Sequence, residues 1–204
     1  MRCDAVIPDP PTMVLELVGQ ESLRDRLRAG PLPLRLALAC VRQVADGLGW
    51  LHQHGIFHRD VKPANILLDD DGTWRLIDLS VAAHGTPPRG LPDGWIEEET
   101  GTSGYAAPEL LAGPETATPS VDIYSLGVVL YEALSGRWPV ELEPGETDGE
   151  FRARAATGPP PVGVDRRGDY PPAVVRAVMR AVEPDPTTRI ASMGEWAGAL
   201  GALG

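Results

Sequence analysis

The stretch that decides the fold reads His-Arg-Asp-Val-Lys-Pro-Ala-Asn and occupies residues 58–65. Two short apolar runs follow it, at 65–68 and 74–77, and an Asp-Asp-Asp-Gly turn separates them. Asp-Gly suits turns that require positive φ, so the two runs predict a β-hairpin. Asp78 comes directly after the second run. A loop followed by a hairpin can therefore bring an acid and an amide of the loop, and a second acid after the hairpin, to one site.

Helices are predicted on both sides of this unit. Apolar residues recur from Leu34 with the spacing of one helical face, and Gly55 ends that segment. Residues 121–134 are apolar nearly all round, which indicates a helix buried in the middle of a helical domain. Two more helices are expected near 172–182 and 192–200.

Three further segments carry weaker patterns. Val6, Ile7 and the run Met13–Val18 are separated by prolines and predict two short strands joined by a turn, the only strands expected before residue 55. Residues 79–108 have no period and are predicted to form a long ordered loop. Residues 141–169 are predicted to be a Gly/Pro-rich connection.

Composition limits the classes of partner. The chain has 204 residues, enough for one domain with a sizeable core, and 29 acidic against 18 basic residues give a net charge of -11. This charge argues against nucleic-acid and anionic-membrane partners. The longest apolar runs fall far short of the roughly 20 residues of a membrane helix. Cys3 and Cys40 form no disulfide framework or metal-ligand spacing, so a reduced, cytoplasmic protein is expected.

In residues 58–65 and at Asp78 the sequence resembles the protein kinase family, whose catalytic loop is H-R-D-x-K-x-x-N and whose metal-binding motif is D-F-G. The resemblance implies that Asp60 accepts the proton of the substrate hydroxyl and that Lys62 lies near the transferred phosphate. It also implies that Asn65 and Asp78 hold the magnesium ions that neutralise the triphosphate of ATP.

The resemblance runs from about residue 5 to the C-terminus. Residues 101–109 end in Ala-Pro-Glu, like the end of the family's activation segment. In the family an acid matching Asp122 holds the backbone of the catalytic loop, and an arginine matching Arg189 pairs with the glutamate, here Glu109. A threonine in the place of Thr102 is typical of members that phosphorylate serine and threonine.

Four residues are expected near the nucleotide by the same resemblance. Backbone groups of Glu16 and Val18 would bind the adenine edge, Glu21 would reach the ribose hydroxyls, and Leu67 would form the apolar floor under adenine. Each has a structural alternative: a strand end for the first two, an acid that stabilises a helix N-terminus for Glu21, and a core leucine for Leu67.

The metal-binding motif departs from the family pattern. Leu79-Ser80 stands where the family has Phe-Gly, and serine lacks the freedom of glycine at positive φ. Arg59, which in the family pairs with a phosphorylated residue, instead has the acids Glu97–Glu99 as possible partners, although such runs are usually solvated.

Several motifs of the family's N-terminal lobe are not found in the sequence: the glycine-rich phosphate loop, the V-A-I-K lysine and its partner glutamate. The expected fold is α+β, a mainly helical kinase C-lobe with a small β-hairpin at the catalytic loop and a two-strand remnant of the N-lobe. Residues 1–18 would be that remnant and the hinge, and 19–204 the C-lobe. The 204 residues alone are expected to bind Mg-ATP poorly and to need a covering N-lobe or partner chain.

Three functions are compared on these residues. The first is a serine/threonine protein kinase that transfers the γ-phosphate of ATP, with Mg²⁺, to a protein substrate. The second is a catalytically silent scaffold or binding module, which has no chemical need for Asp60, Lys62, Asn65 and Asp78 together. The third is a small-molecule phosphotransferase of kinase-like fold, against which Lys62 and the Ala-Pro-Glu segment argue.

Overall fold

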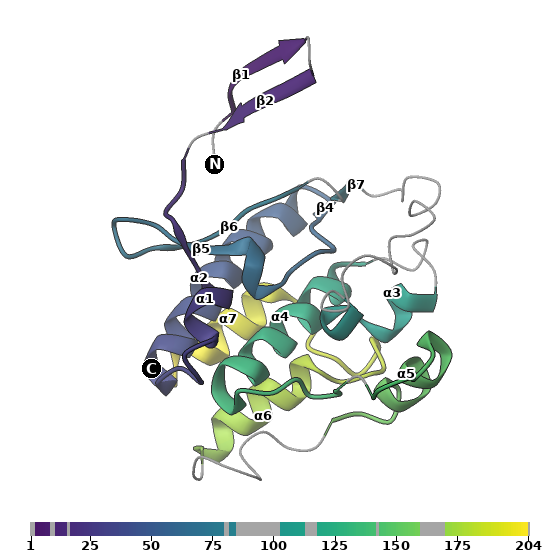
Figure 1. The fold of residues 1–204 in the computed structure, drawn as a ribbon. Coiled ribbons are helices and arrows are strands. Elements are labelled where there is room, and N and C mark those ends of the chain that lie inside the picture. The colour runs from purple at the N-terminus through teal and green to yellow at the C-terminus, as the bar shows by residue number, and fades with distance from the viewer. Residues whose placement is uncertain are drawn as a thin grey trace.

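Helices form the body of the molecule, with small sheets along one side (Figure 1). The computed structural model describes residues 3–8, 11–15, 17–79, 82–84, 103–112, 118–141, 143–159 and 170–203. The four longest central helices are α2 (Leu34–Gln53), α4 (Pro119–Ser135), α6 (Pro172–Ala181) and α7 (Met193–Gly201). Helix α2 packs on α4 and α7, and α6 packs on α4, so all four expected helices are confirmed and share one core.

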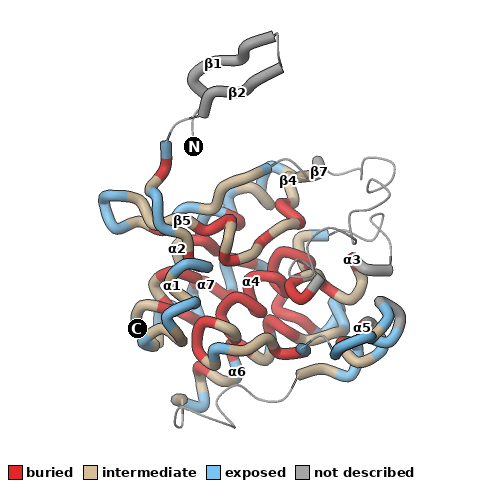
Figure 2. Tube along the Cα trace, in the orientation of Figure 1, coloured by how far each residue is buried: buried red, intermediate tan, exposed pale blue. Residues whose placement is uncertain are grey.

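Helix α4 occupies the centre of this core, as its sequence predicts. Its residues from Val121 to Tyr131 are all buried, and Figure 2 shows it almost entirely in the buried colour. Thr118 caps its start and Gly136, at φ 75°, ends it. Gly127 lies where a Cβ would be 2.8 Å from the Cβ of Ala181, so α4 and α6 approach more closely than any larger residue allows.

Helix α2 buries one face and presents the other to solvent. The buried face carries Ala37, Leu38, Cys40, Val41, Val44, Ala45 and Leu48. The helix ends at Gln53. Gly55 follows with φ 72°, and this left-handed conformation turns the chain toward the catalytic loop.

The predicted hairpin is confirmed by β5 (Ile66–Leu68) and β6 (Trp74–Leu76), which pair antiparallel with Ile66 opposite Leu76. Gly72 supplies the positive φ of the turn at 82°. A further strand, β3 (Glu21–Ser22), pairs with β5, so the expectation of no strand between the first hairpin and residue 55 is wrong. Two residues are too few to show a period, and only their pairing defines the strand.

The remaining strands form two separate pairs. Strands β1 (Cys3–Pro8) and β2 (Pro11–Leu15) are antiparallel with Val6 opposite Met13, which confirms the N-terminal pair of strands. Strand β4 (Ile56–Phe57) pairs with β7 (Ala83–His84), and β7 lies inside the predicted long loop.

Short helical segments complete the fold, and the sequence patterns do not predict them. They are α1 (Leu23–Leu27), the 3-10 turns η1 (Pro63–Asn65) and η2 (Ser103–Tyr105), α3 (Pro108–Ala112) and α5 (Asp148–Ala155). Helix α5 lies within the connection predicted to have no helix. Its Phe151 and Ala155 pack with Val140 in a small cluster outside the main core, so its sequence has little apolar periodicity to detect.

Candidate active site

A buried acid in α4 holds the catalytic loop by its backbone. The carboxylate of Asp122 accepts the N–H of His58 at 2.9 Å and the N–H of Arg59 at 2.7 Å. Asp122 is fully buried, and it lies in the first turn of the most buried helix. The loop is therefore fixed to the core directly before Asp60, as the resemblance to the kinase family implies.

Three functional side chains of the loop meet at one carboxylate oxygen. Oδ2 of Asp60 accepts the Nδ2–H of Asn65 at 2.8 Å and lies 3.0 Å from the ammonium of Lys62. Asn65 also donates to the backbone carbonyl of Asp60 at 2.9 Å. Within the described residues, Oδ1 of Asp60 takes no such bond. One oxygen is thus occupied by loop side chains, and the other is left for a reacting group.

His58 ties the loop to the strand that leads to Asp78. Its Nδ1 accepts the N–H of Asp60 at 3.3 Å, so its Nε2 carries the proton and donates to the carbonyl of Ile77 at 3.1 Å. Ile77 also donates its own N–H to the carbonyl of Asn65 at 2.9 Å. These bonds place Asp78 next to the loop, as the hairpin predicts.

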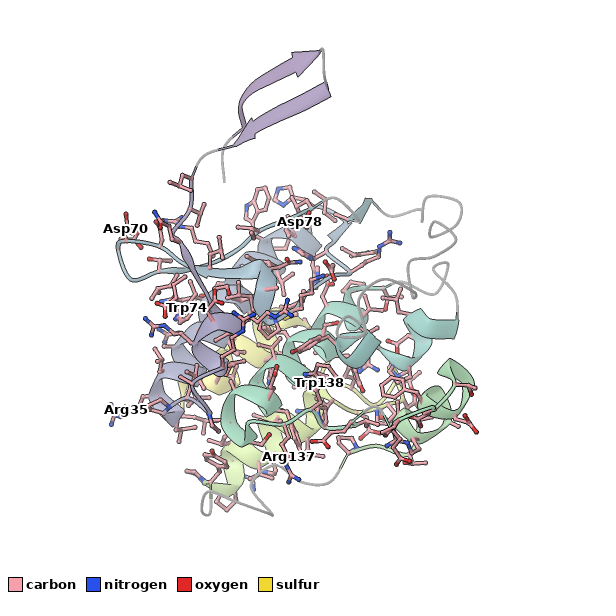
Figure 3. All side chains as sticks on the ribbon, in the orientation of Figure 1. Arg35, Asp70, Trp74, Asp78, Arg137 and Trp138 are labelled. Carbon is pink, nitrogen blue, oxygen red and sulfur yellow. The ribbon has the colours of Figure 1, made fainter. Side chains whose placement is uncertain are left out.

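Two residues of the site have unusual backbone conformations. Arg59 has φ 65° and Asp78 has φ 69°, in the left-handed region that only a few per cent of non-glycine residues adopt. Such conformations gather at functional sites, where the surrounding contacts hold them. Asp78 is seen at the upper edge of the helical body in Figure 3. Burial lowers the pKa of Arg59 from its ordinary value, and the nearby Asp122 carboxylate opposes this shift.

The oxygens of Asn65 and Asp78 fit a hard divalent cation. Because the Nδ2 of Asn65 is occupied by Asp60, its Oδ1 is the atom left to act as a ligand. Amide and carboxylate oxygens suit Mg²⁺, which usually takes one or two protein ligands and completes its shell with water and phosphate. No cluster of three or more His, Cys, Asp or Glu side chains that could hold a metal occurs in the described part of the chain.

Two of the predicted nucleotide residues, Glu21 and Leu67, lie on β3 and β5, and Val18 precedes β3. Val18 is buried, Glu21 pairs with Leu68, and Leu67 lies opposite Ser22. The side chain of Glu21 bonds Arg26 at 2.8 Å, while the helix cap is made by Ser22 and Asp25. Glu21 is exposed and lies directly before this cap, so its structural alternative, an acid that stabilises the helix start, stays open.

Gly19 brings the predicted hinge against the sheet. A Cβ at this position would lie 1.7 Å from the carbonyl oxygen of Leu68, so only glycine allows the chain to cross the end of β5. Glu16 and Thr102, and the acids Glu97–Glu99, lie outside the described residues.

A buried ion pair fixes the segment that ends in Ala-Pro-Glu. Arg189 makes a two-pronged contact with Glu109, at 2.6 and 3.1 Å, which confirms the predicted pair. It also donates to the carbonyl and hydroxyl of Ser120 and to the carbonyls of Glu183 and Pro184. Arg189 lies over the ring of Tyr124, and burial raises the pKa of that phenol to about 12.

The same segment contributes a second, unpredicted network. Tyr105 donates its hydroxyl proton to Glu132 at 2.6 Å, and Trp138 donates its indole N–H to the Tyr105 oxygen at 2.9 Å. Trp138 also packs against Gly104, where a Cβ would meet the indole ring at 2.9 Å. Burial raises the pKa of Glu132, and it also raises the pKa of Tyr105, whose neighbour Glu132 adds to the shift.

Comparison with known families places this geometry in context. The family described as "Protein kinase domain" matches residues 7–192. The chain belongs to the protein kinase family. Similar members of the family include the serine/threonine-protein kinase pkn2 of Myxococcus xanthus, 36% identical over 95% of this chain and 24% of that protein. PknA of Mycobacterium tuberculosis is 35% identical over 94% of this chain and 42% of that protein.

A third protein kinase shows higher identity over a shorter region. The serine/threonine-protein kinase drp72 of Corynebacterium efficiens is 42% identical over 62% of this chain and 24% of that protein. The chain thus spans a quarter to two fifths of the length of these kinases. Among the residues that the structure describes, no helix is both long enough and apolar enough to cross a membrane.

The sequence analysis did not predict one residue that contacts the acid holding the loop. His52, on α2, contacts Asp122 at 2.8 Å. Its position four residues after the buried Leu48 is a detectable signal, because a polar side chain then falls on the buried face of an amphipathic helix. The Tyr105, Glu132 and Trp138 network joins three segments distant in sequence, and no local pattern predicts it.

Proposed function

We propose that this kinase-family chain is part of a serine/threonine protein kinase, which transfers the γ-phosphate of ATP to hydroxyl groups of proteins. The observation that carries the proposal is the geometry at Asp60. One of its carboxylate oxygens is held by Lys62 and Asn65, in a loop whose backbone is bound to a buried acid. This arrangement leaves the other oxygen to orient a substrate hydroxyl and accept its proton.

Each of the other residues has a role in the same step. Lys62 brings a positive charge beside Asp60, where it can stabilise charge on the transferred phosphate. Asn65 and Asp78 would hold Mg²⁺, which supplies charge neutralisation for the triphosphate. Val18 and Leu67 would contact adenine and Glu21 the ribose, with Glu16 as a backbone partner of the adenine edge.

The acceptor is proposed to be serine or threonine. Thr102 stands where serine/threonine-specific members of the family have threonine, and the similar proteins carry names of serine/threonine kinases. Mass spectrometry of the autophosphorylated protein tests this point, and mostly phosphotyrosine would contradict it.

The reaction itself is tested with radiolabelled ATP and a generic basic protein, using this chain supplied with a complete N-lobe. Asp60→Asn is expected to lower phosphate transfer by about 100- to 10,000-fold, the range of general acid-base catalysis. Nucleotide affinity, measured by calorimetry, should change little, since the base acts mainly in the transition state.

The matched control is Asp70→Asn. Asp70 is an exposed aspartate in the turn between β5 and β6, and the same substitution there should leave transfer unchanged. Equal activity of the wild-type protein and Asp60→Asn would remove Asp60 from its role.

A further inference from the structure

An arginine of helix α1 joins the two outer strands of the three-stranded sheet. Nη2 of Arg26 donates to Oε2 of Glu21, in β3, at 2.8 Å. The guanidinium carbon of the same arginine lies 5.4 Å from the ring centroid of Trp74, in β6. Strand β5 lies between β3 and β6. Arg26 therefore bridges two strands that do not pair with each other.

The two contacts of Arg26 lie at the ends of one row of side chains. Glu21 is paired with Leu68 of β5, and Leu68 is paired with Trp74. Residues directly opposite each other in neighbouring strands place their side chains on the same face of a sheet. The carboxylate, the leucine and the indole ring thus form a row across the sheet. A shift of either outer strand relative to β5 would break one of the two contacts that Arg26 makes.

The indole ring beside Arg26 is itself held by the helical core. Trp74 is 3% exposed, and Figure 3 shows it at the side of the body where α1 and α2 lie. Its backbone N–H donates to Oε1 of Gln43, on α2, at 2.8 Å. Because β6 is an edge strand of its sheet, this N–H finds its acceptor on a helix. Arg26 extends this attachment from β6 to β3.

Hydrogen bonding alone does not explain why an arginine stands here. Nε of Arg26 is buried, and it has no hydrogen-bond partner among the described residues. A buried donor without an acceptor costs free energy, whereas the face of an indole ring attracts a guanidinium. An uncharged side chain of similar length would avoid that cost. The position is therefore not optimal for stability, and the bridge between the strands is what the arginine adds.

We propose that Arg26 is a positioning residue for nucleotide binding: by joining Glu21 to Trp74, it fixes β3 against the hairpin of β5 and β6. The consequence for ATP rests on the proposed function, in which Val18 and Leu67 contact adenine. Val18 precedes β3 and Leu67 lies in β5, so loss of the bridge loosens the adenine site. Arg26 touches no nucleotide in this role.

Hydrogen exchange tests the bridge without turnover. Arg26→Met keeps an unbranched side chain and removes the charge. Exchange at the amides of β3 and β5 should become about fivefold faster relative to amides in the centre of α4, because a partly exposed ion pair and a ring contact are each weak. The melting temperature should change by less than about 4 °C, since the variant also loses the buried donor that has no acceptor.

Two further variants test the specificity of the exchange result. Arg28→Met is the matched control, because Arg28 is 68% exposed and pairs with Asp25 at 2.9 Å, and it should leave exchange in β3 and β5 unchanged. Glu21→Gln should give part of the effect alone and add nothing to Arg26→Met, since the pair is already broken there. Unchanged exchange in Arg26→Met, an equal effect of Arg28→Met or full additivity would each overturn the inference.

Steady-state kinetics of this chain supplied with a complete N-lobe test the consequence for ATP. Arg26→Met should raise the KM for ATP about fivefold and leave kcat within about twofold, since Asp122 anchors the catalytic loop separately. Arg26→Lys keeps the charge but lacks the planar group that lies over Trp74, so its KM should be intermediate. An unchanged KM in Arg26→Met would overturn the role in nucleotide binding. A wild-type protein that transfers no phosphate, but shows the expected exchange, would contradict the proposed function alone.

Discussion

Helix α4 is attached to the rest of the molecule by two buried charges of opposite sign. Asp122 is bound by uncharged backbone donors and by His52, and it anchors the catalytic loop. Arg189 is bound by the Glu109 carboxylate and by carbonyl groups, and it anchors the Ala-Pro-Glu segment and the turn at 183–184. Both side chains have no exposed surface.

The difference lies in what each charge fixes. Asp122 binds the backbone within two residues of Asp60, so an error in its position moves the carboxylate of Asp60, the proposed base. Arg189 contacts the Ala-Pro-Glu segment, the turn at 183–184 and the start of α4, and none of its contacts among the described residues is with the loop. Its loss should therefore weaken the fold and leave the chemistry of the folded molecule in place. Burial of a charged side chain therefore does not by itself indicate a role in catalysis. The residues that the side chain binds indicate it.

Loss of the acid should produce the largest effect. Asp122→Ala leaves the N–H groups of His58 and Arg59 without their acceptor, at a cost of about 1 to 3 kcal/mol for each buried group. Phosphate transfer per folded molecule should fall by about 100-fold or more, because the loop loses its position. Denaturant titration and steady-state kinetics measure the two quantities. A variant that is destabilised but has wild-type kcat would show that both anchors are structural.

Loss of the arginine should affect stability and spare the chemistry. Arg189→Ala removes the buried cation that pairs with Glu109 and should lower the free energy of unfolding by about 3 to 5 kcal/mol. The value of kcat, corrected for the folded fraction, should stay within a few-fold. Arg180→Ala is the matched control, since its pair with Glu195 is 57% and 45% exposed and should contribute less than about 1 kcal/mol. Equal losses in the two variants would contradict the importance of burial.

A glycine further along α4 allows the packing of this helix to be tested without any charge. Gly127→Ala would force a Cβ to 2.8 Å from Ala181 and should cost about 1 to 3 kcal/mol through overpacking. Gly47→Ala is the control, because nothing lies within 4 Å of its Cβ on α2 and alanine favours a helix by about 1 kcal/mol. Thermal unfolding should shift in opposite directions for the two variants, and a stabilised Gly127→Ala would disprove the close contact.

The smallest effect is expected at Glu132, which also lies on α4. Burial raises the pKa of Glu132 above its ordinary value of 4.5, so ionisation is disfavoured in the folded state. The stability from this group is complete below its unfolded pKa and is lost as the pH rises through its folded pKa. Glu132→Gln should therefore unfold at a higher temperature than wild type at pH 7. The two proteins should differ little below about pH 4, where an unfolded glutamate is protonated. A variant less stable at pH 7 would contradict the raised pKa.

Local patterns were sufficient for much of the architecture. The face spacing of α2, the apolar composition of α4 and the Asp-Gly turn between β5 and β6 each depend on neighbouring residues, so they can be detected in one sequence. Asp60, Lys62 and Asn65 are close along the chain, and the predicted loop brings them together. Asp78 follows from the register of the hairpin.

Other features depend on contacts between distant segments, which no period records. Strand β3 exists only because β5 lies beside it, and Tyr105 meets Glu132 only because α4 passes under the segment that contains η2. The sequence by itself determined the four long helices α2, α4, α6 and α7, the hairpin and the residues of the catalytic loop, since these follow from local spacing and from motifs. Only the tertiary structure decided that His52 reaches the acid holding that loop, because the contact joins residues 70 positions apart and requires α2 and α4 to be packed together.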